Sequence, residues 1–175
     1  PSEGKTFTAI NLALSIAAEK DKRVLLVDAD VLKPNILRTF GLKERSGLID
    51  YFLGAVKEIG DVMFPSNIYK LTIIPAGRAH HLSTELLASE AMSELITQFS
   101  TRYPDRVVII DTPPIVGINE SAILANFAGQ AVVVVQEGGS RLSDVQKAVA
   151  RLNPNMAIGF VVNKSLDTSQ QSGYY

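Results

Sequence analysis

Short runs of β-branched and other apolar residues recur along this chain, and helix-forming segments separate them. The runs lie at residues 23–28 (RVLLVD), 71–75 (LTIIP), 106–111 (RVVIID), 131–136 (AVVVVQ) and 158–163 (IGFVVN). They show no polar alternation, which is typical of parallel strands covered on both faces. Apolar periodicity and capping residues predict helices over 6–19, 83–102, 119–127 and 143–152. This alternation predicts an α/β fold with three layers, α/β/α, around a mostly parallel central sheet.

The composition fits one ordinary globular domain and excludes several classes of protein. The chain has 175 residues, of which 46% are hydrophobic and 20% charged, and its net charge is −1. This charge balance gives no basic surface, so we expect no nucleic-acid partner. There is no cysteine, which excludes disulfides and thiolate metal sites. The apolar runs are far shorter than the ~20 residues that cross a bilayer.

The chain opens with Gly4, Lys5 and Thr6, the second half of a G-x-x-x-x-G-K-[ST] phosphate-binding loop. In such a loop the glycine lets backbone N–H groups approach phosphate, the lysine reaches the β- and γ-phosphates, and the threonine hydroxyl joins Mg²⁺. We place the flanking Glu3 and Phe7 among the residues that contact the nucleotide. The triplet alone is a weak signal, because a surface turn that enters a helix can carry it too.

Two of the predicted strands end in carboxylates. Residues 23–28 end at Asp28, with Asp30 two positions later, and residues 106–111 end at Asp111. Because ligands of open parallel sheets lie beyond the carboxyl ends of the strands, we expect the three acids to face the phosphate loop. Asp111 then fits the Walker B position, which holds Mg²⁺ directly or through water. The alternatives are a helix cap for Asp28 and Asp30, and an ordinary strand end for Asp111.

A phosphate-binding loop normally follows a strand, whereas this chain opens inside the loop. We therefore expect a fold truncated at its N-terminus, with the first strand missing and poor stability as an isolated chain. Residues 1–164 are predicted to form the nucleotide-binding domain. Residues 165–175 are rich in Ser, Gln and Thr and predict a flexible C-terminal tail that ends in Tyr174 and Tyr175.

With these motifs, the chain resembles the cytoplasmic domain of bacterial tyrosine kinases that control capsule and exopolysaccharide export. Residues 47–54 (GLIDYFLG) resemble the family's G-L-x-D-x-L-x-G, and residues 84–92 (TELLASEAM) resemble its P-x-E-L-L-x-S-x-x-M. Residues 159–164 (GFVVNK) match its final strand. The sequences of residues 77–89 and 128–135 are similar to those of the exosortase-linked branch of this family. The resemblance implies a P-loop ATP-binding kinase domain that transfers phosphate to tyrosine.

Position by position, the resemblance assigns roles to the residues of the site. Lys5 would neutralise the transferred phosphoryl group, and Thr6 would bind Mg²⁺. Asp28 would accept the proton of an incoming tyrosine hydroxyl, while Asp30 and Asp111 would hold the metal. Which of Asp28 and Asp30 is the base stays open.

The resemblance further implies that Asn163 contacts the adenine of ATP, although capping of the strand end accounts for this residue equally well. Tyr174 and Tyr175 stand where the family carries its phosphoacceptor tyrosines, unless they are incidental to the tail. Leu32 departs from the family, which has an arginine there, and Lys33 follows it. The implied partners are further copies of the chain, phosphorylated in trans, and a membrane-anchored polysaccharide co-polymerase or activator. The implied location is the cytoplasm, at the inner membrane.

Two other functions remain open. A partition or septum-site ATPase would use the same fold as a positional switch, but those proteins carry K-G-G-x-G-K-T, and Pro1 and Ser2 stand where that loop has its paired glycines. A non-catalytic ATP-binding regulator is the third class. The adjacent pair His80 and His81 has no spaced Asp or Cys partners, so it predicts no metal site.

Overall fold

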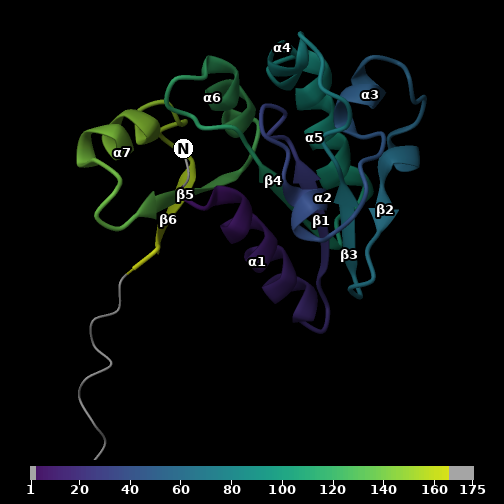
Figure 1. Ribbon diagram of the computed structural model, residues 1–175, viewed down its shortest axis with the longest axis horizontal. Helices are drawn as coiled ribbons and strands as arrows, with labels where there is room; N and C mark the ends of the chain where they lie inside the picture. The colour runs from purple at the N-terminus through teal and green to yellow at the C-terminus, as the bar shows by residue number, and fades with distance from the viewer. Residues whose placement is uncertain (1–2, 166–175) are drawn as a thin grey trace, which may run out of the picture.

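A four-stranded sheet forms the centre of the protein in the computed structural model, which describes residues 3–165 (Figure 1). Strand β1 (Arg23–Asp28) lies between β3 (Leu71–Ile74) and β4 (Arg106–Asp111) and is parallel to both. The short β2 (Phe64–Pro65) pairs antiparallel with β3 at one edge. All residues of β1 after the first are buried, which explains why its sequence is apolar on both faces.

Helices cover both faces of this sheet. Val24 and Leu26 face the core shared with α1 (Lys5–Ala18) and α2 (Ile36–Thr39). Leu25 and Val27 face the opposite core, which is closed by α3 (Leu48–Phe52), α4 (Ser83–Leu87), α5 (Glu90–Arg102) and the 3-10 helix η1 (Ile59–Val62). The predicted α/β/α layering and mostly parallel sheet are therefore confirmed. Within residues 3–165 no helix is long and apolar enough to span a bilayer.

The last two strands form a separate sheet. Strand β5 (Gln130–Gln136) pairs in parallel with β6 (Ala157–Asn163), and neither pairs with β4. Helix α6 (Asn119–Asn126) connects β4 to β5, and α7 (Leu142–Val149) connects β5 to β6. Most of β4 is only half-buried, although its sequence is as apolar as that of β1. The outer edge of β4 has no strand partner in the described part of the chain.

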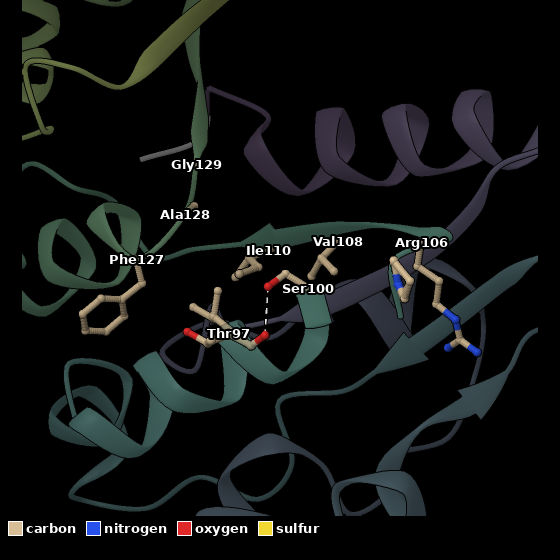
Figure 2. Close-up of a pocket in the computed structure, with 10 residues that line it drawn as sticks. Thr97, Ser100, Arg106, Val108, Ile110, Phe127, Ala128 and Gly129 are labelled. Atoms are coloured by element: carbon tan, nitrogen blue, oxygen red, sulfur yellow. Dashed lines mark hydrogen bonds between the residues drawn. The ribbon is translucent and has the colours of Figure 1, made fainter. Parts of the chain in front are cut away.

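A cavity of about 460 Å³ lies along β4 at this edge (Figure 2). Val108 and Ile110 of β4 line it, together with Ile96 of α5 and the segment around Phe127 that leads into β5. The lining contains none of the predicted site residues. The cavity therefore belongs to the junction between the two sheets, and the candidate site lies elsewhere.

The structure corrects the predicted helix boundaries. The helix predicted over 83–102 is two helices, because the Ser89 hydroxyl accepts a hydrogen bond from the Met92 N–H at 3.2 Å and starts α5 anew. A serine ahead of an apolar pattern predicts an N-cap at Ser83. Ser83 is instead the first residue of α4, and its hydroxyl accepts from the His80 N–H. Ser143 likewise lies inside α7 and does not cap it. The short elements α2, α3, η1 and β2 were not predicted.

A buried carboxylate joins the start of α3 to the loop after β3. Asp50 accepts hydrogen bonds from the backbone N–H of Gly47 at 2.9 Å and of Arg78 at 3.1 Å, and from the Arg78 side chain at 2.8 Å. Gly77 has φ +87°, and a Cβ there would lie 2.4 Å from the Asp50 carboxylate. We call these four residues the Asp50 corner.

Candidate nucleotide site

The phosphate loop enters α1 through a left-handed glycine. Gly4 has φ +96°, a conformation that residues with a side chain rarely adopt, and Lys5 is the first residue of the helix. The first N–H groups of a helix have no intrahelical partner and carry partial positive charge. The beginning of α1 therefore provides donors for an anion.

The carboxylates from two strands meet beside this loop. Asp28 and Asp111 are register partners across β1 and β4, and these residues are only 1% and 3% exposed. Asp30 is also buried. The Thr6 hydroxyl and the charge of Lys5 lie near Asp111 and act to lower its pKa. The structure therefore brings together five of the predicted site residues: Lys5, Thr6, Asp28, Asp30 and Asp111.

Two carboxylate oxygens in this cluster have no hydrogen-bond partner among the described residues. They are Oδ1 of Asp28 and Oδ2 of Asp111. The other Asp28 oxygen accepts from the Ile36 N–H at 3.1 Å, and Asp30 accepts from the Lys33 N–H at 3.1 Å. Asp30 caps no helix, because its partner Lys33 lies in the turn before α2. The capping role is real for Asp28, whose partner Ile36 is the first residue of α2. It still leaves one buried acceptor on Asp28, which a capping role alone does not explain.

Burial changes the ionisation of two of these acids. It raises the pKa of Asp28 to about 7, and the nearby charges of Asp111 and Asp30 add to this effect. Burial also raises the pKa of Asp111 to about 6, with Thr6 and Lys5 acting in the opposite direction and Asp30 in the same one. Such elevated values favour a group that exchanges protons near neutral pH.

The residues fit a magnesium-bound nucleotide. The partnerless oxygen of Asp111 suits a hard cation, that of Asp28 is available to accept a proton, and the left-handed turn at Gly4 suits phosphate. No group of three or more acidic, His or Cys side chains in residues 3–165 could hold a metal by itself. Mg²⁺ typically takes one or two protein carboxylates and completes its shell with phosphate oxygens and water.

The remaining predicted residues lie at the edge of the cluster or outside the described chain. The Glu3 carboxylate is 3.5 Å from Lys5 Nζ. Phe7 is 63% exposed on the first turn of α1. The Asn163 side-chain amide donates to the Glu3 carbonyl at 2.8 Å, a contact that no sequence signal indicated. Tyr174 and Tyr175 lie outside the described residues.

For the other three tyrosines, Tyr51, Tyr69 and Tyr103, the sequence predicts packing in or against the fold, since each lies within the predicted domain. Tyr51 and Tyr103 do so, since both lie against the core on the α5 side of the sheet. Tyr69 does not, because it is 81% exposed in the turn before β3, where the Lys70 ammonium lies over its ring. For Tyr69 the prediction was wrong.

The glycine turn, the helix that follows it and the acids at the strand ends define a P-loop nucleotide-binding domain. The family model described as "AAA domain" matches residues 2–158 of the chain. The sequence is 34% identical to the tyrosine-protein kinase YwqD of Bacillus subtilis, over all of this chain and 73% of that protein. The tyrosine-protein kinase CpsD of Streptococcus pneumoniae is 32% identical, over 97% of this chain and 74% of its own. The chain therefore belongs to the family of bacterial tyrosine-protein kinases.

Solved structures agree with this assignment. The kinase domain of VpsO superposes with a TM-score of 0.83 at 32% identity, over 94% of this chain and 80% of that one. The septum site-determining protein MinD of Pyrococcus horikoshii, complexed with Mg-ADP, has a TM-score of 0.72 at 21% identity, over 92% and 65%, which shows a common fold only. The chain spans about a quarter (24%) of the length of the tyrosine-protein kinase wzc of Salmonella typhimurium, to which it is 34% identical over its full length.

Proposed function

We propose that this chain is the catalytic domain of an ATP-dependent protein-tyrosine autokinase that regulates the chain length and export of exopolysaccharide or capsule. The observation that carries the proposal is the meeting of Lys5 and Thr6 with three buried acids at the ends of two neighbouring strands. Its relatives named tyrosine-protein kinases supply the acceptor class.

We assign the roles in the site as follows. ATP binds with its phosphates at the start of α1, and Lys5 neutralises charge on the transferred group. Thr6, Asp30 and Asp111 hold Mg²⁺, which supplies charge neutralisation for the phosphates. Asp28, whose pKa of about 7 suits a general base, accepts the phenolic proton. Its backbone bond with Ile36 holds the carboxylate in place.

In the transfer step the tyrosine oxygen forms a bond to the γ-phosphorus, and the bond from this phosphorus to the β–γ bridging oxygen breaks. The phenolic proton moves to Asp28, and ADP leaves. Burial of the acids excludes water from the reacting groups, which favours transfer to tyrosine over hydrolysis.

The acceptors in this proposal are Tyr174 and Tyr175 of a neighbouring copy, so the active protein is a homo-oligomer. Each phosphotyrosine adds about −1.5 to −2 charges, which favours release from an acidic site. A membrane-anchored polysaccharide co-polymerase or activator would hold the domain on the cytoplasmic side of the inner membrane. We further propose, from the resemblance of residues 77–89 and 128–135, that the chain belongs to the exosortase-linked branch.

The test is phosphorylation of the tail. The full-length protein is incubated with ATP and Mg²⁺, and tail peptides are analysed by mass spectrometry. We expect phosphate on Tyr174 or Tyr175 and none in Lys5→Met, because that variant lacks the cation at the transferred group. A tail without phosphate in the wild-type protein would refute the kinase proposal.

The same assay separates the alternatives. An ATPase that acts as a positional switch would release phosphate from ATP without labelling tyrosine, and its fold likeness to MinD is the observation in its favour. A non-catalytic regulator would bind ATP and do neither. Leu32, which is 53% exposed where the family has arginine, is the departure that favours such a regulator.

A further inference from the structure

The side chain of Asn163 reaches from the second sheet to the phosphate loop. Asn163 is the last residue of β6, and its amide Nδ2 donates to the Glu3 carbonyl at 2.8 Å across 160 positions of sequence. Because β6 has no strand pairing with the four-stranded sheet in the described residues, this bond is a direct link between the two parts of the fold.

The residues on both sides of this hydrogen bond favour it. On the loop side, a Cβ at Gly4 would lie 2.1 Å from Asn163 Nδ2, so glycine leaves the room that the amide occupies. On the strand side, the Asn163 carbonyl accepts from the Glu137 N–H at 3.0 Å, and the residue pairs in register with Gln136. The backbone of Asn163 is therefore held in place independently of the side-chain bond to Glu3.

We propose that Asn163 is a positioning residue for the phosphate loop. The Glu3 carbonyl and the Gly4 N–H belong to one planar trans peptide group and point in opposite directions. Fixing the carbonyl oxygen on Asn163 therefore fixes the direction of the Gly4 N–H, one of the donors of the loop. The inference rests on the proposed nucleotide binding. It assigns Asn163 a role in binding the phosphates of the nucleotide and not its adenine ring.

The test compares ligands with and without a base. Affinities of the Mg²⁺ complexes of ATP, GTP and inorganic tripolyphosphate are measured by calorimetry for the wild type and Asn163→Ala. We expect all three affinities to fall by the same factor of about 5, as for the loss of one hydrogen bond. A loss for ATP alone, with tripolyphosphate unchanged, would identify a base contact and overturn the inference. Three unchanged affinities would overturn it as well.

A second measurement needs no nucleotide. The Thr8 N–H bonds to the Gly4 carbonyl at 2.9 Å, at the start of α1. We expect its hydrogen exchange to be faster in Asn163→Ala than in the wild type, and an unchanged rate would overturn the inference. If the wild type bound neither ATP nor tripolyphosphate, the proposed function would fail, and the exchange rate would still decide the role of Asn163.

Matched variants separate this effect from general destabilisation. Asn126→Ala also removes an amide bond to a backbone carbonyl, that of Arg151 at 3.0 Å, at the exposed end of α6. It should leave the affinities and the Thr8 exchange rate unchanged. Asn163→Leu, which is close in size but has no donor, should reproduce the loss and replaces Asn163→Ala if that variant does not fold.

Discussion

Asp28 combines a structural and a chemical property in one carboxylate. One oxygen accepts from the Ile36 N–H at the start of α2, and the other has no partner among the described residues. Register pairing places Asp28 directly beside Asp111, so two acids share one buried space. The raised pKa follows from this burial more than from the neighbouring charges. In the protein without nucleotide, ionisation of the buried Asp28 carboxylate therefore lowers the stability of the fold.

This effect predicts a pH dependence of stability. Between the ordinary pKa of 3.8 and about 7, folded Asp28 keeps a proton that the unfolded chain releases. The free energy of unfolding therefore falls as pH rises through this range. Asp28→Asn removes this contribution, and we expect it to raise the free energy of unfolding at about pH 8 by roughly 2 kcal/mol, with little change at about pH 4. Urea unfolding without nucleotide measures it.

The control for this prediction is Asp105→Asn. The Asp105 side chain is 57% exposed and lies 3.5 Å from the Arg23 side chain, so its loss should change stability little at either pH. Equal pH profiles for the wild type and Asp28→Asn would contradict the argument from burial.

At the scale of elements, the Asp50 corner fixes where α3 starts relative to the end of β3. The first N–H groups of α3 donate to the carbonyls of Pro75 and Ala76 at 2.8 and 2.9 Å, so this short helix is capped by the strand's own extension. The two backbones approach too closely for a side chain, since a Cβ on Gly47 would lie 2.1 Å from the Pro75 oxygen. Glycine is required at Gly47 by contact, and at Gly77 by contact and conformation together.

Two glycine substitutions separate these requirements. Gly77→Ala meets both the left-handed φ of +87° and the Asp50 carboxylate, and we expect it to lower the free energy of unfolding by about 3 kcal/mol. Gly54→Ala has a similar φ of +74° with nothing within 4 Å, and should cost only about 1 kcal/mol. Chemical denaturation measures both. Equal losses would show that contact at the corner contributes nothing.

At the scale of the whole molecule, the main feature is the break between the two sheets. Strand β4 is apolar yet half-buried, and a cavity of about 460 Å³ runs beside it. An open apolar edge inside a fold leaves backbone groups without partners. We propose that an additional strand fits between β4 and β5. Because a phosphate-binding loop normally follows a strand, we place this strand immediately ahead of the loop.

Thermal melting tests this proposal. A longer version of the chain that carries an apolar strand ahead of the loop should melt more than about 10 °C above this chain, because the strand buries apolar surface and pairs two edges. The same extension with prolines inside the strand should give no increase, since proline cannot complete the pairing. A cooperative, high-melting transition of the shorter chain alone would contradict the proposal.

Much of the fold was predictable from local signals. The five predicted strands agree with the observed ones to within one residue at each end, because short continuous apolar runs are typical of strands in a covered parallel sheet. The sequence also singled out Lys5, Thr6 and the strand-end acids as candidate site residues, and the structure brings them together because the phosphate loop and the ends of β1 and β4 lie at the same edge of the sheet. The break of the predicted helix at Ser89 was missed, because a serine inside an apolar pattern signals a cap only when its hydroxyl finds an N–H.

The sequence by itself determined the layers, the phosphate loop and the identity of the acids, since these depend on residue type and order along the chain. Only the tertiary structure decided that Asp28 and Asp111 are direct register partners and that the Asn163 amide donates to the Glu3 carbonyl. Such contacts join residues far apart in the chain. Their geometry follows from strand register and packing, which no local pattern encodes.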